Sequence, residues 1–139
     1  MNEAITAAYI DANYIVYDDG RTVVLRIDEK SSYVQQLFER LGIKTAAFIT
    51  AWNPYSQIAT NEENEAANEK LLTELSALCT MVMCGVGQSR TGDWPAEVSF
   101  FACGIPRPDA ERLGVVYRQN AIIWIGETHI PELVVLRAP

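Results

Sequence analysis

The chain is poor in the residues that hold disulfide-bonded or metal-bound proteins together. It contains three cysteines and one histidine among 139 residues. Cys79, Cys84 and Cys103 are odd in number, lie in apolar runs and form no Cys-x-x-Cys pair, so we interpret them as small core residues. A structural zinc site needs about four ligands at close spacing. We therefore expect no disulfide framework, no metal site and no cofactor.

Basic residues and long apolar runs are also scarce. Eleven Lys and Arg against 18 Asp and Glu give a formal net charge of −7, which disfavours contact with nucleic-acid phosphates. No apolar run approaches the roughly 20 residues of a membrane-spanning helix. Residues 1–5 lack the basic region and apolar core of a secretory signal. We expect a cytoplasmic protein with no nucleic-acid partner and no membrane association.

What is present is the composition of an ordinary globular protein, with 49% hydrophobic and 21% charged residues. No repeat or linker interrupts it, which predicts a single domain over residues 1–139. Turn signals and β-rich runs predict an N-terminal helix at 2–12, followed by a β-hairpin with strands at 14–18 and 22–27. Two further helices begin with capping boxes, Ser32-x-x-Gln35 and Thr60-x-x-Glu63. Gly42 ends the first of them.

The second half of the chain alternates strands and helices. Apolar runs predict strands at 45–51, 80–86, 97–103, 121–125 and 133–136, with a helix starting at Pro106 and Pro108. From residue 45 onward the order is strand, helix, strand, strand, helix, strand. This order predicts an α+β protein with a ferredoxin-like split βαβ core, preceded by the N-terminal helix and the hairpin.

This arrangement predicts that polar residues gather at one edge of the sheet. The crossover from the strand at 45–51 to the strand at 80–86 is parallel and right-handed, so both strands end at that edge. Five amides are expected there, and each presents a hydrogen-bond donor and an acceptor to a ligand. They are Asn53, Asn64, Asn68, Gln119 and Asn120. The same side chains can instead tie down loop backbone, and both interpretations stay open.

Aromatic and charged residues are expected at the same edge. Trp52, Tyr55 and Trp94 either stack on a planar ligand or plug the core. Arg90 lies in a glycine-containing loop that can approach an anion, although its spacing matches no phosphate loop.

Glu97 is the candidate catalytic residue, as a general acid or base whose pKa burial raises, with Ser99 on the same strand face. The only histidine, His129, is expected at the opposite edge, which disfavours a Ser-His-Asp triad.

Several of these segments carry a resemblance. Thr50-Ala51-Trp52-Asn53-Pro54, Asn64, Trp94-x-x-Glu97-x-Ser99 and Gln119-Asn120-Ala121 resemble a bacterial family known only as a domain of unknown function. The resemblance covers most of the chain. It implies a bacterial origin and assigns neither an activity nor a catalytic residue.

Three functions follow as hypotheses. The first is binding of a small planar or anionic, nucleotide-like metabolite at the polar edge. The second is an enzyme, a hydrolase or transferase, that uses Glu97 as acid or base on such a ligand. The third is a protein-interaction module without a small ligand, which docks an unidentified protein on the acidic start of the long helix or on the strand at 133–136.

Overall fold

The computed structural model describes residues 1–137 and shows an α+β protein, as the sequence predicts. The described chain contains four α-helices: α1 (Glu3–Asp11), α2 (Ser32–Leu41), α3 (Asn61–Leu78) and α4 (Arg107–Val116). It contains seven strands: β1 (Asn13–Asp18), β2 (Arg21–Leu25), β3 (Ala46–Ile49), β4 (Met81–Gln88), β5 (Glu97–Cys103), β6 (Ala121–Ile125) and β7 (Glu132–Val135). A short 3-10 turn, η1 (Pro54–Ser56), follows β3.

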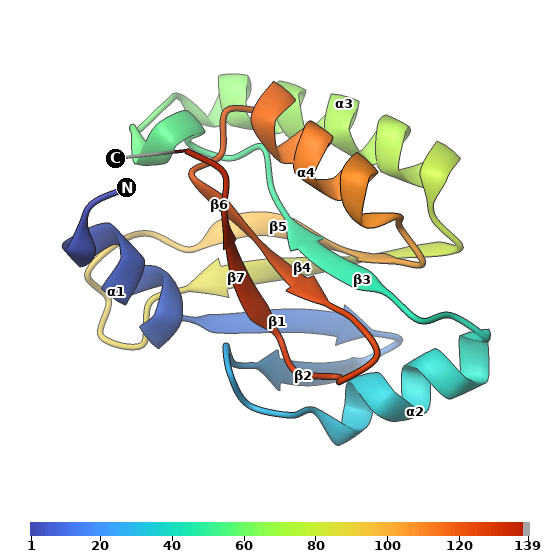
Figure 1. The fold of residues 1–139 in the computed structure, drawn as a ribbon. Helices are drawn as coiled ribbons and strands as arrows, with labels where there is room; N and C mark the ends of the chain where they lie inside the picture. Colours follow the sequence, from blue (N-terminus) through green and yellow to red (C-terminus); the bar gives the residue numbers. More distant parts are fainter. Residues whose placement is uncertain (138–139) are drawn as a thin grey trace.

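All seven strands form one antiparallel sheet in the order β2-β1-β4-β5-β3-β6-β7 (Figure 1). The sheet curls, and the segments that flank its two edge strands meet. The Asp28 N–H donates to the Pro131 carbonyl at 2.8 Å, and the Ser31 N–H donates to the His129 carbonyl at 3.0 Å. The curl therefore brings the residues that follow β2 into hydrogen-bonding contact with those that precede β7.

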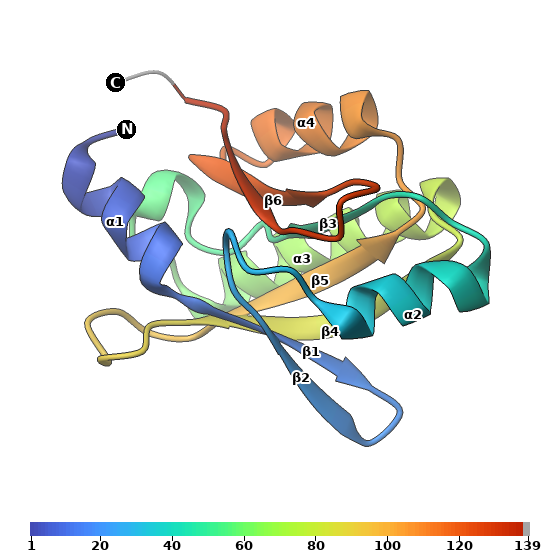
Figure 2. The ribbon, with the colours of Figure 1, turned by 60° about the horizontal axis from the view of Figure 1, so that its bottom comes forward.

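Helices cover both faces of this sheet. On one face α3 and α4 lie side by side, and Leu71, Leu75 and Leu113 pack on strand residues such as Ile49 and Phe100 (Figure 1). On the other face α2 packs through Val34, Leu37 and Phe38 into a second apolar cluster (Figure 2). The β1–β2 hairpin twists away from the sheet on that side (Figure 2). Both layers follow from strands that are apolar on both faces.

The capping signals give a mixed result. The predicted capping box at Thr60 is confirmed, because the Thr60 hydroxyl accepts from the Glu63 N–H and the Glu63 carboxylate accepts from the Thr60 N–H. The predicted box at Ser32 is wrong. Ser31 caps α2, and its hydroxyl accepts from the Val34 N–H at 3.2 Å. Two adjacent serines offer the same cap, and the chain direction entering the helix selects between them.

Within residues 1–137, no helix is both long and apolar enough to cross a membrane.

Close strand packing predicts different effects for two glycines of β4. A Cβ at Gly85 would overlap the Ile15 carbonyl oxygen and lie 2.9 Å from the Phe48 ring. We expect Gly85→Ala to lower the free energy of unfolding by about 1–3 kcal/mol, because the β1–β4 pair and Phe48 must move apart. The measurement is urea denaturation followed by circular dichroism.

Gly87→Ala is the matched control on the same strand, because its Cβ has no neighbour closer than 3.9 Å. Its free energy of unfolding should stay within about 0.5 kcal/mol of wild type. Equal losses in the two variants would contradict the steric argument.

Candidate functional site

Helix α1, η1 and the β4–β5 loop come together at one end of the molecule (Figures 1 and 2). Residues of all three segments line a pocket there. Its volume is about 290 Å³. Its lining comes from α1 (Ile5, Ala8, Tyr9), from the segment after β3 (Asn53, Ser56, Ile58), from the β4–β5 loop (Asp93, Trp94, Pro95) and from the first residue of β5 (Glu97). We call it the outer pocket.

A second, smaller cavity adjoins the outer pocket toward the sheet. Its volume is about 40 Å³. Tyr9, Trp94 and Glu97 line both spaces, so they form the boundary between them. Four further polar side chains line the smaller space, which we call the inner cavity: Tyr14, Thr50, Ser99 and Gln119.

Glu97 is the titratable group at this boundary. Burial raises the pKa of its carboxyl from 4.5 to about 7, and the hydrogen bond from Asn53 acts in the opposite direction. The Asn53 Nδ2 donates to Glu97 Oε2 at 3.2 Å. Near neutral pH, Glu97 is therefore present in both protonation states, as an acid–base group requires. Its position at the start of β5 is what the strand pattern predicted.

The segment carrying Asn53 has an uncommon backbone. Asn53, Tyr55 and Ser56 have φ values of 46°, 54° and 60°, in the left-handed region that disfavours residues with a Cβ. Asn64 on α3 holds it in place by reciprocal bonds: the Asn53 N–H donates to Asn64 Oδ1 at 2.8 Å, and Asn64 Nδ2 donates to Asn53 Oδ1 at 2.9 Å. Strain of this kind concentrates at functional sites.

The remaining amides also form hydrogen bonds within the protein. Asn68 Oδ1 accepts from the Ala51 N–H and its Nδ2 donates to the Val98 carbonyl, both at 2.9 Å. Asn120 Nδ2 donates to Ser56 Oγ at 2.9 Å. Gln119 Nε2 donates to the Trp52 and Tyr117 carbonyls while its side chain lines the inner cavity. These bonds tie the strained segment to α3, β5 and the residues before β6.

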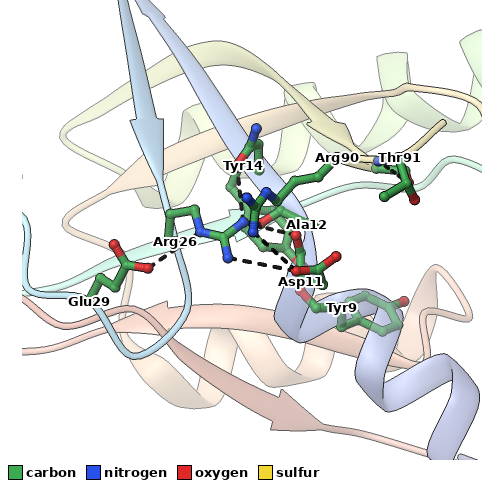
Figure 3. A network of polar contacts seen from close by, with 10 residues as sticks. Tyr9, Asp11, Ala12, Tyr14, Arg26, Glu29, Arg90 and Thr91 are labelled. Carbon is green, nitrogen blue, oxygen red and sulfur yellow. Dashed lines mark hydrogen bonds and ion pairs between the residues drawn. The ribbon is translucent and has the colours of Figure 1, made fainter.

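Helix α1 forms one wall of the pocket although none of its residues is fully buried. Arg26 anchors its C-terminal end by donating to the carbonyl oxygens of Asp11 at 2.8 Å and Ala12 at 3.3 Å (Figure 3). Asp11 also pairs with Arg90 at 3.3 Å, and the Tyr14 hydroxyl donates to the Tyr9 carbonyl (Figure 3). These contacts fix α1, whose Tyr9 lines both spaces together with Glu97.

Tyr9 is a neutral phenol in this setting. Burial, and to a lesser extent the nearby Glu97 carboxylate, raise its pKa to about 12, while the hydrogen bond with Ser56 acts in the opposite direction. The hydroxyl therefore keeps its proton and can donate a hydrogen bond at any pH near neutrality.

The structure brings together some of the residues selected from the sequence and separates others. Asn53, Trp94 and Glu97 line the outer pocket, and Ser99 and Gln119 reach the inner cavity. Asn64 and Asn120 bond to the strained segment and line neither space, while Trp52 and Asn68 line a separate groove beside α3. Arg90 pairs with Asp11, and Tyr55 lies 4.1 Å from the Arg137 guanidinium.

Sequence reasoning missed the residues that α1 and the loops contribute. Tyr9, Ser56 and Asp93 are the polar ones. A signal for the α1 wall exists, since Ile5, Ala8 and Tyr9 have the i, i+3, i+4 spacing of one helix face. Nothing in that spacing says what the face covers. Among residues 1–137, no group of three or more His, Cys, Asp or Glu side chains is arranged to hold a metal ion.

The raised pKa of Glu97 predicts a pH-dependent stability. Between pH 4.5 and about 7 the folded protein binds a proton that the unfolded chain has released, so this contribution is complete below pH 4.5 and is lost as pH rises through 7. We expect the free energy of unfolding of wild type, relative to Glu97→Gln, to fall by about 2–3 kcal/mol from pH 4 to pH 8.

The measurement is urea denaturation of both proteins across that range. The control is Glu39→Gln, which changes an exposed glutamate on α2 and should track wild type at every pH. A pH-independent difference between wild type and Glu97→Gln would contradict the raised pKa.

The Asn64 pairing predicts a large effect of a small substitution. Asn64→Ala leaves the buried Asn53 N–H without its partner, so we expect a loss of about 2–3 kcal/mol in the free energy of unfolding. Asn61→Ala, an exposed asparagine on the same helix, should change it by about 0.5 kcal/mol or less. Thermal denaturation of both variants measures the difference, and equal losses would show that the reciprocal bonds contribute little.

Comparison with known proteins gives a family and no activity. Searches of curated proteins and of solved structures found no match. A family model described as "Protein of unknown function (DUF3293)" matches residues 49–122, more than half of the chain. The matched segment includes Asn53, Asn64, Glu97 and Gln119, whereas α1 and Tyr9 lie outside it. The chain therefore belongs to the DUF3293 family of proteins of unknown function.

Proposed function

We propose that this protein binds a small planar molecule, uncharged or cationic, in the outer pocket. The observation that carries the proposal is the Glu97 carboxyl, hydrogen-bonded to the Asn53 amide and placed in a pocket that Tyr9 and Trp94 also line. A few polar groups among apolar and aromatic walls are typical of small-molecule sites.

The size of the pocket supports a small ligand. A volume of about 290 Å³ lies at the lower end of the range for ligand sites, which begins near roughly 300 Å³. One or two fused rings fill such a space. Trp94 and Tyr9 supply aromatic surface for a flat molecule, and the exposed Ile58 adds apolar surface at the pocket.

The charge of the lining favours an uncharged or cationic ligand over an anionic one. Asp93 and Glu97 are the charged residues of the outer pocket, and among the described lining residues there is no Lys or Arg. A phosphate or carboxylate would therefore face two carboxylates and no compensating cation. Arg90, the anion-binding candidate from the sequence, is instead paired with Asp11.

Hydrogen bonding supports a ligand with N–H donors. Ionised Glu97 accepts hydrogen bonds from an amidine or amino-heterocycle edge, and protonated Glu97 can donate to a ring nitrogen. The carboxyl thus suits a nucleobase-like ring without its phosphate. A cationic ligand should bind more tightly as pH rises through the pKa of Glu97, near 7.

We also propose the ferredoxin-like arrangement for the segment from β3 to β6. Its support is the local strand order β4-β5-β3-β6, with β3 and β4 both antiparallel to the β5 strand between them. The position of α3 and α4 on one face supports it as well (Figure 1). In this arrangement the segment after β3 and the loop before β5 lie at one edge, where the outer pocket is.

Binding can be tested with pairs of planar probes that differ in charge. We expect benzamidine and adenine to raise the melting temperature of the protein at pH 8, and benzoate and AMP to raise it less or not at all. Glu97→Gln should raise the dissociation constant of benzamidine at least tenfold, about 1.4 kcal/mol, because it removes the charge that faces the amidine. Calorimetric titration measures the change.

Trp94→Leu should weaken both benzamidine and adenine, because it removes aromatic surface. The control Glu39→Gln should bind both as wild type does. Tighter binding of benzoate than of benzamidine, or no effect of Glu97→Gln, would overturn the proposal.

A further inference from the structure

The inner cavity has the size and polarity of a water site. Its volume of about 40 Å³ exceeds the roughly 10–15 Å³ that one water molecule requires. Glu97, Ser99, Thr50 and Gln119 line it, which provides more than the two polar partners that a buried water needs. The outer pocket, where a ligand would lie, shares the Glu97 boundary.

The polar groups of the inner cavity present mostly acceptors. The Ser99 hydroxyl donates to the Glu97 carbonyl at 2.9 Å, and the Thr50 hydroxyl donates to the Val98 carbonyl at 2.7 Å. Gln119 Nε2 donates to two main-chain carbonyls, which leaves its Oε1 as an acceptor. A water that donated both of its protons to these acceptors would keep an oxygen lone pair for an electrophile.

No thiol, imidazole or serine hydroxyl of either cavity is equipped as a nucleophile in the part of the chain that the structure describes. Neither lining contains Cys or His. The Ser99 hydroxyl is committed to a main-chain carbonyl, and Ser56 accepts a hydrogen bond from Asn120. Activation of serine requires an adjacent base. A water molecule in the inner cavity is therefore the nucleophile that this lining favours, with Glu97 at the cavity boundary.

We propose that the site is hydrolytic: a water in the inner cavity, deprotonated by Glu97, attacks the acyl carbon of an uncharged planar ester or amide bound in the outer pocket. This inference rests on the proposed binding function. It adds the reaction and the class of substrate.

The step balances without a cofactor or a redox partner. An O–H bond of water breaks, its proton moves to the Glu97 carboxylate, and a C–O bond forms at the acyl carbon. The carbonyl electrons move to oxygen, where the neutral Tyr9 phenol can donate a hydrogen bond to the developing charge. The bond to the alcohol or amine then breaks, and Glu97 returns the proton to that leaving group.

The pH dependence follows from the groups around Glu97. Tyr9 on α1, Tyr14 on β1 and Asp93 in the β4–β5 loop are the titratable groups near it. Burial raises the pKa of both tyrosines, so they stay neutral over the working range. Hydrolysis should therefore rise with pH through about 7, as Glu97 ionises, and then level off.

The test uses phenyl acetate as the substrate and acetanilide as its slowly hydrolysed analogue. Phenol release should be catalysed by wild type, and Glu97→Gln should lower kcat at least 100-fold while acetanilide binding changes little. Gly87→Ala places a methyl group 4.0 Å from Ser99 Oγ, so it reduces the inner cavity and should lower kcat tenfold or more with acetanilide binding unchanged. Glu39→Gln should match wild type.

A single turnover in ¹⁸O-labelled water identifies the nucleophile. Direct attack by water places the label in acetate and none in the protein. An acetylated serine, or label in the Glu97 carboxylate, would overturn the water mechanism. Acetanilide binding without phenyl acetate turnover would overturn hydrolysis and leave the binding proposal intact. Absence of binding by acetanilide, benzamidine and adenine would instead mean that the proposed binding function itself fails.

Discussion

The reciprocal hydrogen bonds between Asn53 and Asn64 determine where the polar groups of the site lie. Three of the four residues from Asn53 to Ser56 adopt left-handed backbone conformations, which local sterics disfavour. The segment keeps this path because Asn64, buried on α3, binds both the main chain and the side chain of Asn53. The same path directs the Asn53 amide to Glu97. Without it, the carboxyl would be half-buried and unpartnered.

Glu97 combines two opposing effects. Burial disfavours its charged form, while the Asn53 amide stabilises that form and limits the rise in pKa. The result is a carboxyl that exchanges its proton near neutral pH at a position open to the outer pocket. A fully solvated glutamate would be permanently ionised there, and one buried without a partner would stay protonated. Burial of the Glu97 carboxyl therefore both destabilises its charged form and gives it a pKa suited to proton transfer.

The two interpretations of the amide cluster divide between its members. Asn64, Asn68 and Asn120 hydrogen-bond to the segment after β3 and to β5, and they line neither the outer pocket nor the inner cavity. Asn53 and Gln119 bond to the protein and also reach those spaces. The asparagines of α3 thus support two cavities whose polar lining comes from loops, a β-strand and α1. Rigid support of this kind positions polar groups without requiring them to be close in sequence.

Much of the fold was predictable because its signals are local. The capping box at Thr60, the hairpin turn at Asp19-Gly20 and the alternation of β5 each depend on residues a few positions apart. The gathering of Asn53, Trp94 and Glu97 followed from the strand order. The cap of α2 was misplaced by one residue because Ser31 and Ser32 carry the same signal.

The sequence by itself determined the elements and put acid, amide and aromatic groups at one sheet edge. Only the tertiary structure decided which of them meet, because those contacts depend on how α1 docks and how the sheet curls. Tyr9 and Glu97 line the same pocket because Arg26, which follows β2, anchors the end of α1. Arg90 forms an ion pair with Asp11, the last residue of α1, so this pairing also depends on where α1 docks. Such contacts join segments distant in the chain, and short-range patterns of hydrophobicity and turn chemistry contain no information about them.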